Sequence, residues 1–211
     1  MLPRPDKMLH RLASVDPLAG APRSYNKNDH TVEAVISMGS PVMRAYGTEV
    51  LRIAPDAVDL SRLHEGGIPL LDHHLQTGIN SMLGRLTDAW FERSALIGRF
   101  KFNQTPEGEQ AEGMVARGEV TGLSPGYRVD QWLVADGDGD IVDEKNVRWD
   151  DELTFTATRW QLFEASLVGV PADATAAVRS ISGYDPMIAD VRARMVARHN
   201  MVKRLSRLHD E

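Results

Sequence analysis

Ser124 is the serine best placed for nucleophilic chemistry, within segment 121–127 (TGLSPGY). The segment resembles a strand, and side chains alternate between the faces of a strand, so Gly122, Ser124 and Gly126 share one face. Two glycines beside a serine leave its hydroxyl unshielded and let a substrate backbone come close. We therefore expect a serine nucleophile here, with Gly122 and Gly126 serving the oxyanion or a substrate strand. The competing interpretation is a bulge or turn in which Ser-Pro-Gly only bends the chain.

Two adjacent histidines, His73 and His74, end an apolar run that begins at Leu70. A run that leads straight into imidazoles places at least one ring at the rim of the core, where a neutral histidine suits a general base. Alternation along a strand points the two rings in opposite directions, so one of them is expected to act. The alternative is a structural histidine that is hydrogen-bonded at a strand end.

Glu164 is surrounded by aromatic and aliphatic residues in segment 160–168 (WQLFEASLV). A carboxylate in such a setting is costly unless it is paired. Orienting a histidine through its second ring nitrogen would supply the pairing. A structural salt bridge to one of the arginines explains the segment equally well.

Two other motifs point toward metal chemistry. Residues 72–74 (DHH) match the tripeptide that names the DHH phosphoesterases, which also need aspartates on earlier strands. Residues 30–60 offer only Asp56 and Asp59, and both lie outside the predicted strands. Segment 136–147 begins like an EF-hand loop but lacks its glycine at position six and its glutamate at position twelve. The sequence therefore predicts no metal site.

The elements that must position these residues are mostly strands. Thr105 is a capping hydroxyl, Pro106 suits the first helical position, and the helix is expected to stop at Gly118. A short helix or turn is expected over 56–63, and a loop over 136–140. Alternation and β-branched content predict strands over 31–36, 42–53, 68–74, 82–91, 95–102, 119–129, 153–157 and 159–170.

The chain has 211 residues, no cysteine and a formal charge of −6. The absence of cysteine excludes a disulfide framework, a thiolate zinc site and a cysteine nucleophile. A nucleophile must then be a hydroxyl, a carboxylate or an activated water. No apolar run is long enough to cross a bilayer, and the start of the chain lacks the apolar stretch of a secretory signal. We expect a soluble protein without a membrane partner or a direct nucleic-acid role.

Charge is distributed unevenly, with about +3 in residues 1–27, +3 in residues 186–211 and −12 between them. Residues 1–28 lack periodicity and are interpreted as a flexible basic arm. Residues 183–211 are interpreted as a basic amphipathic helix, because apolar residues recur at helical spacing. This helix either packs on its own domain or serves as an assembly handle for a partner helix.

Four segments in this order resemble the caudovirus prohead serine protease family, the maturation proteases of tailed phages. They are a histidine after a Leu-Leu-Asp strand, the segment 83–85 (LGR), the segment 122–129 (GLSPGYRV) and the segment 164–172 (EASLVGVPA). Segments 31–35 and 41–44 are also similar to that family. The resemblance covers roughly residues 25–182, and we expect the protease domain to span residues 29–182.

The resemblance implies an α+β, mainly β fold: a β-barrel with flanking helices, related to herpesvirus assemblin. It implies a cofactor-free serine endopeptidase that acts inside the procapsid, in the host cytoplasm. The implied substrates are the scaffolding part of the capsid precursor and the protease itself, with self-association during assembly. Carried over by position, Ser124 is the nucleophile and His74 the base, with His73 as the alternative base.

The third catalytic member is expected to be Glu164, although assemblin-like enzymes use a second histidine in that role. One departure from the family pattern is Pro125, where the family usually has a small or β-branched residue. Proline has no N–H and cannot donate to an oxyanion hole, which must then use Gly126 or another loop. Pro125 therefore also keeps a second hypothesis open, a catalytically impaired scaffolding protein on the same fold. A DHH-type metal phosphoesterase ranks third.

Overall fold

A computed structural model describes residues 9–10, 22, 24–142 and 152–169, and this part of the chain is mainly β, as predicted. Its elements are, in chain order, β1 (Leu9–His10), β2 (Thr31–Ser37), β3 (Val42–Arg44), β4 (Gly47–Leu51), β5 (Val58–Asp59), α1 (Arg62–Glu65), β6 (Ile68–Asp72), the 3-10 turn η1 (Ile79–Ser81), β7 (Met82–Glu92), β8 (Ala95–Phe102), α2 (Pro106–Ala116), β9 (Gly122–Ala135) and β10 (Thr154–Val168).

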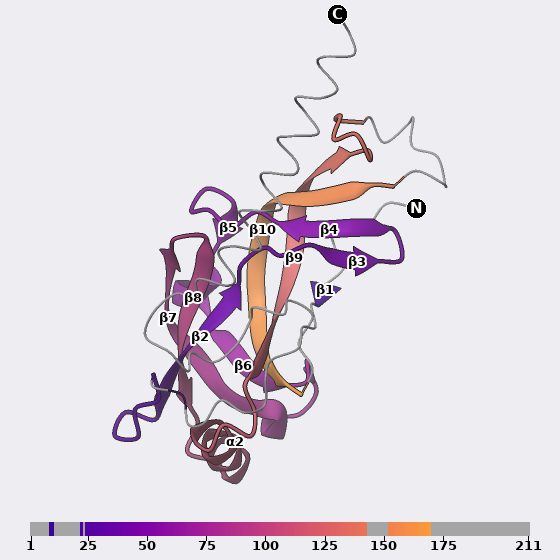
Figure 1. The fold of residues 1–211 in the computed structure, drawn as a ribbon. Helices are drawn as coiled ribbons and strands as arrows, with labels where there is room; N and C mark the ends of the chain where they lie inside the picture. Colours follow the sequence, from indigo (N-terminus) through magenta and orange to yellow (C-terminus); the bar gives the residue numbers. More distant parts are fainter. Residues whose placement is uncertain (1–8, 11–21, 23, 143–151, 170–211) are drawn as a thin grey trace, which may run out of the picture.

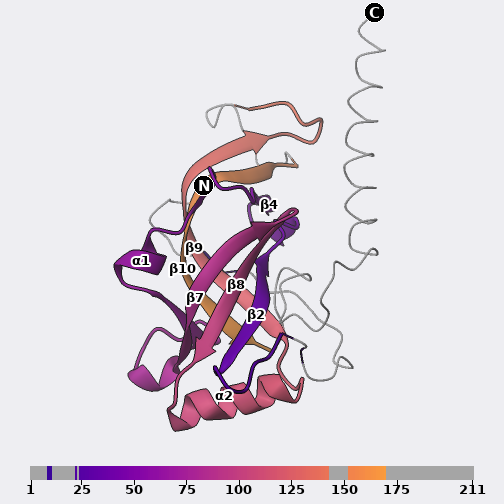
Figure 2. The same cartoon turned by 90° about the vertical axis from the view of Figure 1, so that its left-hand side faces the viewer.

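The strands form one curled sheet in the order β1-β9-β10-β6-β7-β8-β2 (Figure 1). Its centre is the long antiparallel pair of β9 and β10, and β10 also pairs in parallel with β4, β5 and β6 at successive points along its length. Viewed from the side, β7, β8 and β2 run next to one another, with α2 across one end of the sheet (Figure 2). The half-barrel shape follows from the twist that accumulates between neighbouring strands.

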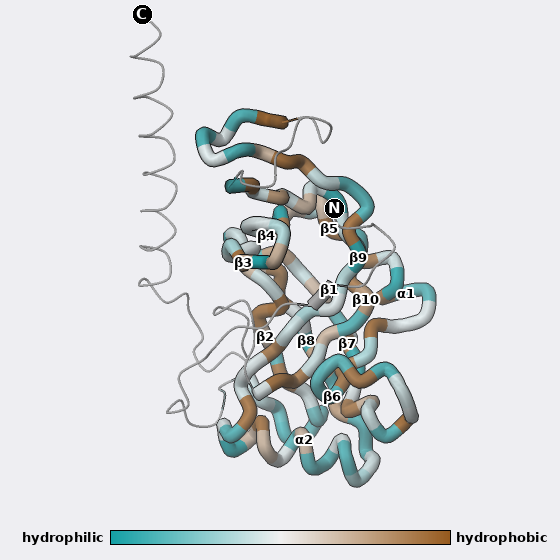
Figure 3. Tube along the Cα trace, turned by 90° about the vertical axis from the view of Figure 1, so that its right-hand side faces the viewer, coloured by the Kyte–Doolittle hydropathy of each residue, from teal (hydrophilic) through white to brown (hydrophobic). Residues whose placement is uncertain are grey.

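Apolar side chains on the concave face of the sheet form the main core. Trp160 of β10 and Tyr127 of β9 are fully buried there, with ring centroids 5.7 Å apart. Phe100 of β8 and Ile36 of β2 belong to the same cluster. The trace coloured by hydropathy shows hydrophobic stretches along the strands, whereas α2 is largely hydrophilic (Figure 3). The sheet is therefore held by packing contacts between strands that are far apart in sequence.

The helix α2 begins where the sequence predicts it. Thr105 is the N-cap, its hydroxyl accepts a hydrogen bond from the Gly108 amide at 3.2 Å, and Pro106 occupies the first turn. The chain leaves the helix at Gly118, which has a φ of +73°, a conformation that glycine adopts without strain. Ala111 and Val115 face the core, so one side of the helix closes the end of the half-barrel.

Several local predictions differ from the structure. The strand expected over 42–53 is a hairpin of two strands, β3 and β4, which pair antiparallel. The two strands expected over 153–157 and 159–170 are one strand, β10, whose register shifts at Arg159 and near Phe163 mark β-bulges instead of a break. Strand β9 continues beyond Val129 to Ala135, because its partner β10 extends equally far. Segment 56–63 contains a short strand, β5, followed by the start of α1, because β10 offers β5 a parallel partner.

Two other expectations fall largely outside the described residues. The helix predicted over 183–211 lies wholly there, and so does most of the arm predicted over 1–28. The described part of that arm includes β1, which pairs with β9. The half-barrel agrees with the mainly β class, and its relation to assemblin stays a prediction. Within the described ranges, no helix has the length and apolarity needed to cross a membrane.

Candidate active site

Two neighbouring strands, β9 and β10, present polar side chains on the face of the sheet that lies opposite the core. Ser124 of β9 is directly opposite Ser166 of β10, and Gly126 is opposite Glu164. Paired residues of an antiparallel ladder point to the same face, so the two serines and the carboxylate share that face. Pro125 interrupts neither strand, and β9 runs from Gly122 to Ala135. The bulge or turn considered for Ser-Pro-Gly is therefore absent from β9.

A tight turn after β6 brings the histidines onto this face. The Leu75 amide donates to the Asp72 carbonyl at 2.8 Å, and the two central residues, His73 and His74, have φ values of +44° and +62°. Two central residues with positive φ are typical of a type I′ turn. The His73 amide also donates to the Leu167 carbonyl at 3.1 Å, which anchors the turn to β10. The two rings make different contacts, as expected. The reason differs from the prediction: β6 ends at Asp72, so a left-handed turn and not alternation along a strand separates the rings.

His74 links Ser124 to Glu164 by two hydrogen bonds. Its Nδ1 is 2.6 Å from Glu164 Oε1, and its Nε2 is 3.0 Å from Ser124 Oγ. With Glu164 as a carboxylate, which only accepts hydrogen bonds, the matching tautomer of His74 has the proton on Nδ1 and donates it to Glu164. Nε2 then has a free lone pair and accepts the Ser124 hydroxyl proton. This is the geometry of a serine nucleophile, a histidine base and an acidic orienting residue.

Ser166 completes the arrangement, although the sequence analysis assigned it no role. Its hydroxyl donates to Glu164 Oε2 at 2.8 Å and accepts the His74 amide at 3.0 Å. Glu164 is only 2% exposed, so each of its oxygens needs a donor. The signal in the sequence was the Glu-x-Ser spacing on one strand, which places both side chains on the same face. Ser166 thus fixes both the carboxylate and the backbone that carries the imidazole.

Gly126 has a steric role that the sequence analysis did not foresee. A Cβ atom at this position would lie 2.0 Å from Glu164 Oε1 and 2.6 Å from its Cδ. The carboxylate therefore occupies the space that a side chain at position 126 would need. Only glycine lets Glu164 reach His74 from the neighbouring strand, and this requirement is separate from the predicted roles in oxyanion binding or substrate pairing.

His73, the alternative base, makes different contacts. Its Nδ1 is 2.6 Å from Asp72 Oδ1, and its Nε2 accepts the Gly169 amide at 3.3 Å. The side chain is 63% exposed, compared with 12% for His74. Its contacts tie the turn to the end of β10, whereas His74 is the histidine that contacts Ser124. Within the Asp-His-His tripeptide, His73 therefore anchors the turn and His74 contacts Ser124. Across the described ranges, no group of three His, Asp or Glu side chains is arranged to hold a metal ion.

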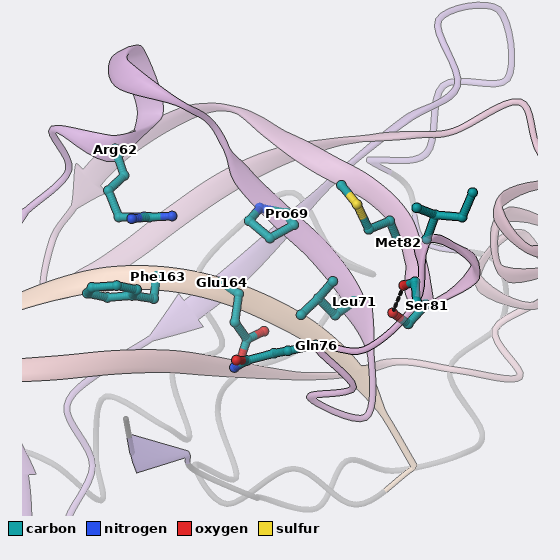
Figure 4. Close-up of a pocket in the computed structure, with 10 residues that line it drawn as sticks. Arg62, Pro69, Leu71, Gln76, Ser81, Met82, Phe163 and Glu164 are labelled. Atoms are coloured by element: carbon teal, nitrogen blue, oxygen red, sulfur yellow. Dashed lines mark hydrogen bonds between the residues drawn. The ribbon is translucent and has the colours of Figure 1, made fainter. Parts of the chain in front are cut away.

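A cavity of about 440 Å³ lies beside Glu164 on the same side of the sheet (Figure 4). Arg62 and Phe163 stand at one end of it, with the guanidinium carbon 4.5 Å from the ring centroid, and Met82 and Ser81 stand at the other. The wall between these two ends is mainly apolar and includes Leu71. The cavity adjoins the carboxylate member of the site, and Ser124 is not among its lining residues.

Comparison of the sequence with known proteins identifies its family. Residues 23–189 match the family described as Caudovirus prohead serine protease. The chain belongs to that family. The match covers most of the sequence, including the three strands and the turn that hold Ser124, His74 and Glu164. The prohead protease resemblance seen in the sequence is therefore confirmed, although it does not by itself assign roles to these residues.

A curated relative of this prohead protease family member is the major capsid protein of Halomonas phage phiHAP-1. It is 31% identical over 139 residues, which are 65% of this chain but 21% of the relative. The chain thus spans about one fifth of that capsid protein. No solved structure matches the chain.

Removing the Ser166 hydroxyl should weaken the site without disturbing the sheet. In Ser166→Ala, Glu164 Oε2 loses a donor and the His74 amide loses its acceptor, so we expect kcat to fall about tenfold with little change in KM. The matched control is Ser37→Ala, since Ser37 is also fully buried but lies on β2. Steady-state kinetics on a peptide substrate measure both variants. An equal loss in both would contradict a positioning role for Ser166.

Proposed function

We propose that this chain is a serine endopeptidase of phage capsid maturation, with Ser124 as nucleophile, His74 as general base and Glu164 as orienting acid. The observation that carries the proposal is the continuous hydrogen-bonded chain from Ser124 Oγ through the His74 ring to Glu164. Three residues, from β9, β10 and the turn after β6, meet in this order. Family membership supports the same reading.

The proposed reaction follows from these contacts. Ser124 Oγ attacks a peptide carbonyl while His74 Nε2 accepts its proton, and Glu164 stabilises the imidazolium that forms. His74 then gives the proton to the leaving amine, and the C–N bond breaks to leave an acyl-enzyme. Water, deprotonated by the same nitrogen, attacks the ester and restores Ser124. Because Pro125 lacks an N–H, another donor must bind the oxyanion, and Gly126 or a loop remains the proposed source.

The proposed substrates are the scaffolding part of the capsid precursor and the protease itself, inside the procapsid in the host cytoplasm. Two findings support this: the prohead family match and the capsid protein relative, whose length leaves most of it outside the matched region. Self-association during assembly belongs to the same proposal. Co-expression with the neighbouring capsid precursor and mass spectrometry of the cleaved ends tests the substrate; precursor left intact by the wild-type chain would contradict it.

The second candidate is a scaffolding protein that has lost activity, for which the specific observation is Pro125. A fluorophosphonate probe separates the two functions. We expect the probe to modify Ser124 in the wild-type chain. In His74→Ala the rate of modification should be lower by about 100-fold or more, because the hydroxyl is then not activated. Tryptic mass spectrometry identifies the modified serine. Labelling that is absent from both proteins under assembly conditions would favour the scaffold.

A further inference from the structure

Arg62 of α1, at one end of the cavity beside Glu164, is a cation without an acidic partner in the described part of the chain. Its Nε is buried and has no hydrogen-bond partner there. The guanidinium lies over the ring of Phe163, 4.5 Å from the centroid, and Figure 4 shows it reaching the cavity above that ring. A guanidinium that lies on an aromatic face keeps its N–H donors for a carboxylate. This end of the cavity therefore offers a positive charge and hydrogen-bond donors to a ligand.

A β-bulge in β10 brings two consecutive residues, Phe163 and Glu164, to this cavity. Consecutive residues of a regular strand point to opposite faces, so they do not normally line one site. The pairing of β10 with β9 shifts register between Leu162 and Glu164, and within these two strands Phe163 is paired with no residue. Both Phe163 and Glu164 line the cavity as a result. The bulge thus re-aims the ring that supports the cation toward the side of the sheet that holds the proposed catalytic residues.

The strand register places the cavity on the same face of the sheet as the proposed nucleophile. Residues paired from strand to strand form a row across β9, β10, β6 and β7: Ser124, Ser166, Leu71 and Met82. Paired residues point to one face, and both Leu71 and Met82 line the cavity. Because neighbouring strands are about 4.8 Å apart, Leu71 is about 10 Å from Ser124. An extended peptide with its scissile bond at Ser124 covers this distance with about three residues.

We propose that the cavity is a specificity pocket for an acidic side chain of the substrate, about three residues from the scissile bond, and that Arg62 recognises the carboxylate of that side chain. The inference deepens the proposed function and rests on it. A guanidinium and a carboxylate form strong, charge-assisted hydrogen bonds, and their geometry excludes an uncharged or basic side chain from the same position. Arg62 is thus a specificity-determining residue, distinct from the residues that perform the reaction.

The size and the walls of the cavity fit this ligand. Its volume of about 440 Å³ is within the usual range of ligand sites. The apolar wall around Leu71 would cover the methylene groups of the bound side chain, and an apolar surrounding strengthens an ion pair. Glu164 also lines the cavity, but its carboxylate is hydrogen-bonded to His74 and Ser166. It makes no ion pair with the guanidinium, so that charge is left for the ligand.

Carboxylate binding is measured without catalysis, by NMR of the full-length Ser124→Ala chain isotopically labelled on nitrogen. The probes are the N-methylamides of acetyl-glutamate and acetyl-glutamine, which differ in charge and hardly in shape. The Arg62 Nε–H signal is identified by its absence from the spectrum of Arg62→Met. It should shift with the glutamate probe at a Kd of about 10 mM or lower, and the glutamine probe should bind about fivefold more weakly or less. Equal Kd values for the two probes, or an Arg62 signal that does not shift, would overturn the inference.

The matched control for Arg62→Met is Arg128→Met. The Arg128 guanidinium also lies over Phe163, 5.3 Å from the ring centroid. It differs in that it pairs with Asp130 at 3.3 Å and does not line the cavity. Circular dichroism checks that both variants are folded. Weaker binding of the glutamate probe is expected in Arg62→Met alone.

Cleavage by the chain with Ser124 intact gives a second measurement. The substrates are a quenched fluorescent library of octapeptides in which one position at a time is fixed as glutamate or glutamine. At a position about three residues from the cleaved bond, the wild-type and Arg128→Met chains should have about tenfold higher kcat/KM for the glutamate set. Arg62→Met should bring the two sets to within about twofold of each other, and Arg62→Lys, which keeps the charge, should retain part of the preference.

The outcomes separate this inference from the proposed function. A wild-type chain that cleaves both sets equally at every position, or the same loss of preference in Arg128→Met, would overturn the pocket and leave the protease standing. Binding of the glutamate probe that depends on Arg62, without cleavage of any peptide by the chain that has Ser124, would support the carboxylate pocket and overturn the protease.

Discussion

Ser124→Ala should abolish cleavage of the capsid precursor and leave the fold intact. The variant removes the only proposed nucleophile, and loss of the nucleophile in a serine triad lowers kcat about 10⁴- to 10⁶-fold. Cleavage is followed by gel electrophoresis and mass spectrometry after co-expression. The side chain is small and buried, and alanine keeps most of its volume, so we expect the free energy of unfolding to change by about 1 kcal/mol.

The control for this experiment is Ser37→Ala, which removes another fully buried hydroxyl, on β2. It should cleave at the wild-type rate. Thermal unfolding by circular dichroism checks that both variants are folded. If Ser124→Ala still processed the precursor, the assignment of the nucleophile would be wrong.

The second large effect is expected from Gly126→Ala, a change of one methyl group. The new Cβ would lie 2.0 Å from Glu164 Oε1, closer than any real contact of this kind, so the carboxylate must move away from His74. His74 then loses the group that holds its Nδ1 proton and its orientation. We expect kcat to fall about 10²- to 10⁴-fold, as when a triad loses its acid. Crowding should also destabilise the protein by about 1–3 kcal/mol.

The matched control is Gly113→Ala on α2. A Cβ there meets only the flexible end of Arg117, at 3.0 Å, and alanine favours a helix by about 0.5–1 kcal/mol over glycine. The control should be as active as the wild type and slightly more stable. Steady-state kinetics measure kcat for both variants, and chemical denaturation measures the free energy of unfolding of both. Full activity in Gly126→Ala would show that the carboxylate does not need this position.

Much of the local structure could be predicted from the sequence because it depends on neighbouring residues. The Thr105-Pro106 pair sets the start of α2, and Gly118 follows its end. Alternation along β9 placed Gly122, Ser124 and Gly126 on one face. The break expected within β10 was wrong, because a bulge keeps a strand paired where its own alternation fails. Sequence patterns do not show what a distant partner strand tolerates.

The sequence by itself determined which residue types were available: with no cysteine, a hydroxyl became the natural nucleophile, and Ser124 stood between two glycines. The family pattern favoured His74 over His73. The tertiary structure decided how Ser124, His74 and Glu164 meet. His74 contacts Ser124 and Glu164 across sequence separations of 50 and 90 residues. Those contacts depend on strand register and on a left-handed turn. The need for glycine at position 126 and the pairing of β1 with β9 arise only when separate strands lie side by side.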